Sequence, residues 1–360
     1  MDLRSCLLPD DLFVSYWLDD DLIVVSGDHT DVLSVERADA TGLKKLVYQF
    51  EQCVTRPDHY TAFIAADRRP MPCPDPAASP TLLIDLSILL SSRLITPQVR
   101  TLVSSGLYRR LLLFPDGILH VLPLDRLICA DQLNLATAKG VIYAPSASAY
   151  AYACGRKRKD PLRHALIVIG DRDDELLNRE AQKVAECLPC QSNVVTTREE
   201  LLRQTERADL LYIASHGTAP DSQDANRGWA LLFDGATLSA EDFYRERVRL
   251  ARSAVVVLSA CSVGRLTPGP AHELDGLIHA LFFGGAATIM AARWPVLYEA
   301  AEAVFLGAIS QAFNGSCSLS MAFQSAVTDA ALRENIQSYM ASPESELFFS
   351  GPFALFGCGD

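Results

Sequence analysis

The second half of the chain alternates short apolar runs with longer amphipathic segments, and this pattern limits the fold more than any other feature. The apolar runs are rich in β-branched residues and occupy 165–170, 193–196, 210–215, 254–260, 286–292 and 352–357. Apolar residues at helical spacing occupy 174–188, 198–207, 272–284 and 298–313. Strands that alternate with helices predict an α/β fold, with a mostly parallel sheet flanked by helices on both faces.

The first half of the chain is less regular. Its patterns predict strands at 13–18, 22–27 and 31–37, helices at 40–54 and 81–94, and a strand–turn–strand unit at 109–127 around a Pro-Asp-Gly turn. Prolines predict a loop at 68–80, and a basic run at 154–161 predicts an exposed connection. We therefore predict two units, residues 1–155 and residues 156–360.

Composition narrows the class of partner. The 360 residues include 44 acidic and 32 basic side chains, and the net charge of −12 repels nucleic acid and anionic lipid surfaces. The longest apolar stretch, 277–292, contains His279 and a Gly-Gly pair and is too short to span a bilayer. The start has no signal-peptide pattern, and the ten cysteines show no zinc-binding spacing. We expect a cytoplasmic protein with free thiols that binds neither nucleic acid nor membrane.

Two of the predicted strands end in side chains that can perform chemistry. His216 follows the apolar run at 210–215, and Cys261 follows the run at 254–260. The carboxyl ends of parallel strands meet at one edge of a sheet, where α/β proteins hold ligands and catalytic groups. A thiol attacks as the thiolate, and a nearby imidazole can take its proton. We therefore interpret His216 and Cys261 as the two halves of one site.

The residues beside this pair fit the same chemistry. The oxyanion that forms when a thiolate attacks an amide needs backbone N–H donors. Gly217 allows a close approach of the backbone because it has no Cβ, so the N–H groups of Gly217 and Cys261 form the predicted oxyanion hole. Each residue alone also fits a simpler interpretation, with Cys261 as a core thiol and His216–Gly217 as a turn that ends a strand.

The order and spacing of these residues match caspase-type cysteine peptidases, in which the histidine lies about 50 residues before the cysteine. The segments "IASHG", "LSACSVG" and "HELDGLIHALFFGGAATIMAARWPV" resemble the CHAT family of caspase-like peptidases, which are relatives of separases, caspases and gingipains. The segments "FPDGILHVLPLDRL", "YAPSASAY" and "FFSGPFALFG" resemble further parts of that family in the expected order. The resemblance extends from about residue 10 to residue 358.

The resemblance implies a caspase-hemoglobinase fold, in which a degenerate first half packs against a catalytic second half. It implies a cysteine endopeptidase with His216 as general base and Cys261 as nucleophile, and this chemistry needs no cofactor and no metal. Family members often lie beside defence or cell-death modules, so a protein substrate and an activating protein are the expected partners. Two alternatives are a non-catalytic caspase-like adaptor and an unrelated thiol acyltransferase on a doubly wound sheet.

The resemblance also suggests residues that contact substrate. In caspase-like enzymes the strand after the active-site helix lines the substrate groove, which makes Arg293 and Trp294 candidates, although Trp294 equally fits core packing. Glu273 and Asp275 lie in the loop after Cys261 and are candidates for binding a basic side chain of the substrate. As acidic residues near a helix N-terminus, they also fit a purely structural role.

An acidic run, "GDRDDE" at 170–175, follows the first strand of the second half. Its carboxylates are suited to a divalent cation, because hard cations prefer oxygen ligands. Capping of the following helix is the interpretation we favour. His272 and His279 have no third ligand at metal-binding spacing, so we predict no metal site.

Overall fold

The computed structural model describes residues 3–55, 80–129, 134–137, 140–156, 161–218, 230–233, 236–251, 254–261, 263–264, 267–268, 274–315, 317–331 and 343–359. Residues 68–79 of the loop predicted at 68–80, and residues 157–160 of the basic run at 154–161, lie outside these residues. None of the helices in these ranges is long and apolar enough to cross a lipid bilayer.

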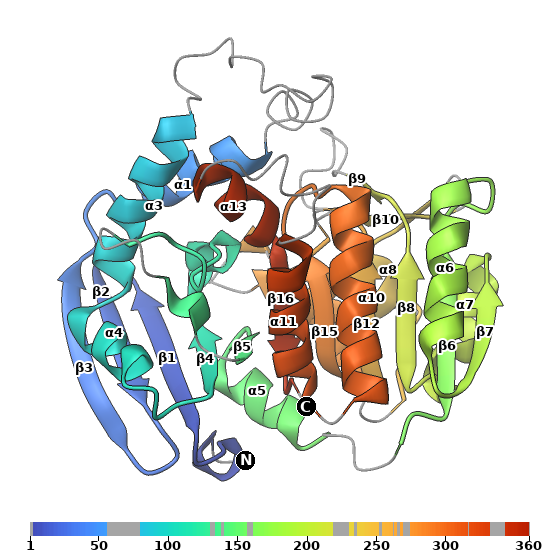
Figure 1. The fold of residues 1–360 in the computed structure, drawn as a ribbon, viewed down its shortest axis with the longest axis horizontal. Coiled ribbons are helices and arrows are strands. Elements are labelled where there is room, and N and C mark those ends of the chain that lie inside the picture. The colour runs from blue at the N-terminus through green and yellow to red at the C-terminus, as the bar shows by residue number, and fades with distance from the viewer. Residues whose placement is uncertain are drawn as a thin grey trace.

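One twisted sheet runs through the whole molecule (Figure 1). Its eleven strands lie in the spatial order β3 (Val32–Asp39), β2 (Asp21–Gly27), β1 (Asp11–Leu18), β4 (Arg110–Phe114), β5 (Gly140–Tyr143), β16 (Phe353–Gly357), β15 (Ala286–Ala292), β12 (Ala254–Ser259), β8 (Leu210–Ala214), β6 (His164–Ile169) and β7 (Gln191–Val195). Neighbouring strands are parallel except at β3–β2, β2–β1 and β16–β15. The predicted α/β fold with a mostly parallel sheet is therefore confirmed.

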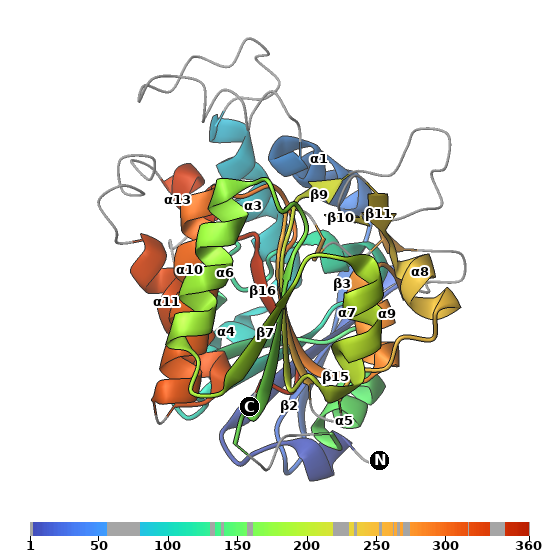
Figure 2. The same ribbon diagram turned by 90° about the vertical axis from the view of Figure 1, so that its right-hand side faces the viewer.

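Helices cover both faces of this sheet (Figure 2). One face packs against α6 (Glu175–Cys187), α10 (Tyr298–Asn314) and α11 (Leu319–Ala331). The other face packs against α1 (Leu43–Thr55), α3 (Pro80–Leu94), α4 (Pro97–Ser104), α7 (Arg198–Gln204), α8 (Ala240–Arg245), α9 (Leu277–Gly284) and α13 (Pro343–Ser350). The helix α5 (Ala147–Cys154) contributes buried residues to both layers.

The two covered faces explain why the strands are apolar throughout. In β8, Leu211 and Ile213 belong to the core under α7, α8 and α9, whereas Leu210 and Tyr212 belong to the core under α6 and α10. Successive side chains of a strand point to opposite faces, so a strand between two helical layers has no solvent face. Continuous apolar runs, rather than alternating ones, are the consequence.

The predicted elements of the second half are confirmed with small shifts of their ends. All six predicted strands form, and α6, α7 and α10 begin within one residue of the predicted positions. The helix α9 begins at Leu277, later than the predicted residue 272, because β14 (Leu274–Asp275) precedes it and pairs with β13 (Thr267–Pro268). A small sheet of β9 (Gly217–Thr218), β10 (Ala230–Phe233) and β11 (Ala236–Leu238) was not predicted.

The first half contains the predicted β1, β2, β3, α1 and α3, but one prediction was wrong. The residues after the Pro-Asp-Gly turn form a 3-10 helix, Gly117–Val121, and not a strand. Gly117 has a positive φ of 50°, and the Leu119 and Leu122 amides donate to carbonyls three residues earlier. An apolar run of this length fits a buried turn of helix as well as a strand.

The division into two units at residue 155 stays a prediction. The strands of both halves form one continuous sheet, in which β16 from the end of the chain lies between β5 and β15.

A buried ion pair joins β1 to β4. Asp11 and Arg110 are opposite each other in the parallel register, and the guanidinium donates two hydrogen bonds of 2.6 and 2.7 Å to the carboxylate. Both side chains are buried. Bidentate geometry offsets the cost of removing two charges from water, but only while both partners are present.

Asp11→Asn therefore leaves a buried, uncompensated guanidinium, and we expect the free energy of unfolding to fall by about 3–5 kcal/mol in urea denaturation. Asp21→Asn is the matched control, because Asp21 pairs with Arg37 on the surface. Loss of that exposed pair should cost less than about 1 kcal/mol. Equal losses in the two variants would contradict the structural role of the buried pair.

Candidate active site

The strands β8 and β12 place His216 and Cys261 side by side. They pair in parallel with Ala214 opposite Ser259, and the Ser215 amide donates to the Ser259 carbonyl at 3.1 Å. His216 and Cys261 each lie two residues beyond this last pair. The in-register ends therefore deliver both residues to the same edge of the sheet, as the sequence predicts.

Gly217 packs directly against the backbone of Cys261. A Cβ built at Gly217 would lie only 1.8 Å from the Cys261 carbonyl oxygen, so only glycine can hold this position. From the other side, the Leu232 amide of β10 donates to the His216 carbonyl at 2.8 Å. The structure thus fixes the backbones of His216, Gly217 and Cys261 relative to one another.

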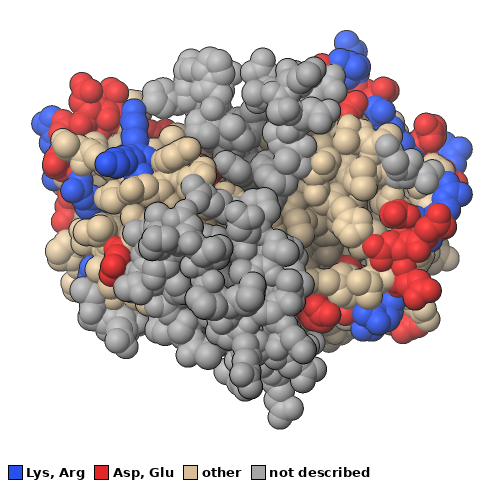
Figure 3. Space-filling model, turned by 90° about the horizontal axis from the view of Figure 1, so that it is seen from above, with Lys and Arg blue, Asp and Glu red and all other residues tan. Residues whose placement is uncertain are grey.

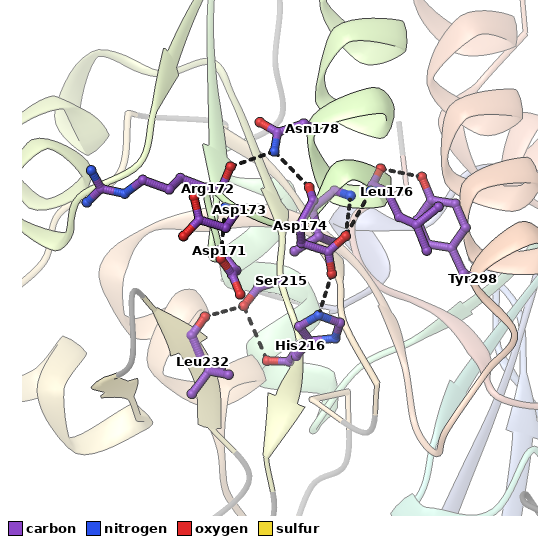
Figure 4. Close-up of polar contacts among 11 residues, drawn as sticks. Asp171, Arg172, Asp173, Asp174, Leu176, Asn178, Ser215, His216, Leu232 and Tyr298 are labelled. Carbon is purple, nitrogen blue, oxygen red and sulfur yellow. Dashed lines mark hydrogen bonds and ion pairs between the residues drawn. The ribbon is translucent and has the colours of Figure 1, made fainter.

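The imidazole of His216 is held by Asp174 (Figure 4). Nε2 lies 2.9 Å from Asp174 Oδ2, and the His216 side chain remains 56% exposed. Asp174 is also the N-cap of α6, where its Oδ1 accepts from the amides of Leu176 and Leu177. Burial raises the pKa of Asp174, but hydrogen bonds from His216 and these amides outweigh it and lower the pKa below the usual value. The carboxylate stays ionised and leaves Nδ1 as the ring nitrogen open to a second partner.

Asp174 has two roles, and the sequence predicted only one of them. The favoured interpretation of 170–175 as a helix cap is confirmed at Asp174. Its contact with His216, 42 residues later, was missed. The available signal was topological, because β6 lies next to β8 in the sheet and ends at the same edge. Within the described ranges, no group of three His, Cys, Asp or Glu side chains is arranged to hold a metal ion.

The thiol of Cys261 contacts the backbone of Val296. Its sulfur is 3.8 Å from the Val296 carbonyl oxygen, in the segment that follows β15. Burial raises the pKa of the Cys261 thiol, and the contact with Val296 lowers it only in part. No hydrogen bond joins the Cys261 thiol to the His216 imidazole. In this conformation the backbones of the two residues are adjacent, whereas the thiol contacts Val296 and the imidazole contacts Asp174.

Comparison with known proteins identifies the family of the chain. The family model described as CHAT domain matches residues 86–353, about three quarters of the chain. The chain belongs to the CHAT domain family. Comparison with curated proteins gives no match to the sequence.

Two solved structures of the Saccharomyces cerevisiae separase–securin complex are similar to this CHAT chain, with TM-scores of 0.58 and 0.54 and identities of 10% and 11%. Each similarity covers 99% of this chain, which spans 30% of the matched chain. The complex of Porphyromonas gingivalis RgpB pro- and mature domains has a TM-score of 0.46 and 9% identity over 88% of this chain and 76% of that one. The family match confirms the predicted CHAT membership, and the similarity to separase confirms the predicted caspase-like fold.

The CHAT fold places two predicted substrate residues in its core. The Arg293 side chain is 2% exposed and stacks on the Tyr143 ring at 4.1 Å. Trp294 is buried, and its Nε1 donates to the Phe348 carbonyl at 3.1 Å. Core packing, the alternative for Trp294, is therefore what the structure shows, and the contact of these two side chains with substrate stays a prediction that would require them to leave the core.

The acidic candidates in the loop after Cys261 are only partly described. The backbone of Asp275 forms β14, opposite Thr267 of β13. Glu273 lies outside the described residues, so the role of Glu273 and Asp275 in reading a basic side chain stays a prediction. Figure 3 looks onto this end of the molecule and shows acidic side chains gathered over the part that holds α6 and α7.

A buried glutamate ties α6 to both strands of the site. Glu180 accepts hydrogen bonds from the Ser259 hydroxyl at 2.6 Å and from the Tyr212 hydroxyl, so it links the helix capped by Asp174 to β12 and β8. Burial raises the pKa of Glu180 to about 7. Because the folded-state pKa lies above the ordinary value of 4.5, the contribution of Glu180 to stability is fully present below pH 4.5 and is lost as pH rises towards 7.

We expect Glu180→Gln to remove this pH dependence, because the amide oxygen still accepts both hydrogen bonds but does not ionise. Relative to Glu180→Gln, the wild-type free energy of unfolding should fall between pH 4.5 and about 7, by up to about 1.4 kcal/mol for each pH unit. Urea denaturation across this range measures the difference. The exposed Glu186→Gln is the control and should follow the wild type; a wild-type-like Glu180→Gln would contradict the assignment.

Proposed function

We propose that this protein is a cysteine endopeptidase that hydrolyses a peptide bond in a protein substrate. Cys261 is the nucleophile, His216 is the general acid and base, and Asp174 positions the imidazole. One observation carries the proposal: Gly217 packs on the Cys261 backbone while Asp174 holds the adjacent His216 ring. In this proposal Cys261, His216 and Asp174 act as nucleophile, base and orienting group, the three roles found in cysteine and serine hydrolases.

The reaction proceeds in two halves. The His216 imidazole takes the thiol proton, the thiolate attacks the peptide carbonyl carbon, and the N–H groups of Gly217 and Cys261 stabilise the oxyanion. The C–N bond breaks as the imidazolium donates its proton to the leaving amine, which leaves a thioester on Cys261. Water then attacks the thioester, gives one proton to His216 and releases the acid, and the thiol takes that proton back.

The resting geometry favours an enzyme that a partner switches on. The Cys261 thiol has a raised pKa and no hydrogen bond to His216, so little thiolate exists at neutral pH. Separase, which this chain resembles in fold, forms a complex with securin. A protein that shifts the Cys261–Val296 contact would bring the thiol to the imidazole. A defence or cell-death setting, as the family suggests, suits such controlled activity.

The raised pKa of the Cys261 thiol and its lack of a hydrogen bond to His216 also favour a second candidate, a caspase-like adaptor that binds partners without catalysis. Thiol reactivity separates the two functions. A catalytic Cys261 reacts with iodoacetamide faster than the other cysteines once the protein is active, because the thiolate is the reacting form. An adaptor has no need of a reactive thiol.

Cys261→Ala should abolish cleavage of a proteome-derived peptide library, measured as new termini by mass spectrometry. Cys317→Ala, at another half-buried free cysteine, is the matched control and should cleave like the wild type. The residue before each new terminus reports the specificity, and a basic residue there supports Glu273 or Asp275. Termini that persist in Cys261→Ala would contradict the proposed nucleophile.

Asp174→Asn should lower kcat by about 100-fold or more while KM changes little, because the ring loses the carboxylate that orients and stabilises it as imidazolium. Asparagine caps a helix as well as aspartate does, so the unfolding temperature should be unchanged. Asp173→Asn, at the exposed neighbour, should retain full activity. An active Asp174→Asn enzyme would show that Asp174 acts only as a cap.

A further inference from the structure

A second surface with binding chemistry lies away from the candidate active site. It is an open groove of about 860 Å³ between α5, the segment after α8, and α9. Its main side chains are Tyr152, Tyr244, Arg247, Arg249, His279 and Phe283. The C-terminal end of α9 leads directly into the start of β15, so the groove lies towards the amino ends of the parallel strands. His216 and Cys261 lie at the opposite, carboxyl ends.

The groove presents an aromatic surface that is already held in place. Phe283 is 74% exposed and Tyr152 is 49% exposed, which is unusual for side chains that would gain from burial. The Tyr244 ring packs edge-on against Phe283 at 5.6 Å, and its hydroxyl lies 2.9 Å from His279 Nδ1. These contacts fix the rings before any ligand binds, which lowers the entropic cost of binding.

Positive charge surrounds this aromatic surface. Arg247 and Arg249 are both exposed, and neither forms an ion pair within the described part of the chain. The guanidinium of Arg156 lies over the Tyr152 ring at 4.5 Å and donates to the Gly285 carbonyl. None of the described lining residues is acidic, in a chain whose net charge is −12. The groove is therefore a local positive site on a negative protein.

The backbone at Arg247 supports a role for its side chain. Arg247 has a φ of +49°, and it is the only non-glycine residue with a positive φ in the described ranges. Glycine or asparagine would hold this helix-ending conformation with less strain, which is on the order of 1 kcal/mol for other residues. The strain is fixed by hydrogen bonds from the Arg247 and Val248 amides to carbonyls of α8. Strained residues of this kind gather at binding sites.

We propose that this groove docks an acidic segment of a partner protein. An aromatic or branched apolar side chain of that segment packs against Phe283 and Tyr152, and its carboxylates pair with Arg247 and Arg249. The net charge of −12 repels both ligands, but it disfavours a nucleic acid, with one charge on every nucleotide, more than a short segment in which apolar residues separate a few carboxylates. The mixture of exposed aromatic rings and arginines is typical of protein-binding hot spots.

The groove is also connected to the candidate active site through α9. This helix begins directly after β14, in the segment that follows Cys261, and its other end lines the groove. A segment docked on Phe283 therefore contacts the C-terminal end of the helix that follows β14 in the sequence. The docking itself is independent of catalysis, and only its effect on activity rests on the proposed function.

Fluorescence anisotropy tests the docking directly. The probe is a fluorescein-labelled pool of peptides with alternating acidic and apolar residues, titrated with the 360-residue chain carrying Cys261→Ala so that no peptide is cleaved. We expect a Kd on the order of 10 µM, and about a tenfold loss of affinity in R247E/R249E. R203E/R207E, which makes the same charge change at exposed arginines near β6, should change affinity less than about twofold. Phe283→Ser should also weaken binding.

Defined results would overturn the proposal. These are no binding of the acidic pool, equal binding of a pool with lysine in place of the acidic residues, or equal losses in R247E/R249E and R203E/R207E. Tighter binding of a single-stranded oligonucleotide that depends on Arg247 and Arg249 would assign the groove to nucleic acid instead. An unchanged unfolding temperature in each variant ensures that a loss of binding reflects the groove. Peptidase activity does not enter these readouts, so the failure of one proposal is distinct from the failure of the other.

Discussion

The parallel register of β8 and β12 is the constraint on which the rest of the site depends. Because Ala214 of β8 pairs with Ser259 of β12, His216 and Cys261, each two positions further along its strand, lie at the same edge of the sheet. Gly217 then approaches the Cys261 carbonyl so closely that no side chain fits between them. A shift of one residue in either strand would turn its side chains to the opposite helical layer. The burial of both faces of the sheet therefore fixes the site.

Two buried polar side chains near this site, Glu180 and Arg293, cost free energy because they are removed from water. Glu180 is satisfied by two hydroxyl donors, and it connects α6 to both strands. Arg293 has no hydrogen-bond partner for its guanidinium nitrogens in the described structure and relies on the rings of Tyr143 and Phe356. An unpaired buried charge costs several kcal/mol. Arg293 lies three residues before Val296, whose carbonyl contacts Cys261. Movement of the Arg293 guanidinium into water would recover part of the free energy that its burial costs.

Two chemically different regions lie at opposite ends of the same parallel strands. At the carboxyl ends, Asp174, His216 and Cys261 provide a carboxylate, a base and a thiol. At the amino ends, arginines and exposed aromatic rings surround α9. The helix α9 follows Cys261 in the sequence, and its C-terminal end borders the groove. The two regions are therefore separate surfaces of the same fold.

The sequence by itself determined the elements and the pairing of the site. Apolar β-branched runs specified the strands of the second half, because strands between two helical layers must be apolar throughout. A histidine and a cysteine that follow two such strands specified where a site would lie. The tertiary structure alone decided which contacts these side chains make. Asp174 reaches His216 from a helix start 42 residues away, and Trp294 and Arg293 turn into the core, because such contacts depend on how the layers pack. The helical turn at 117–121 had the same cause, since short apolar runs fit either structure and burial decides between them.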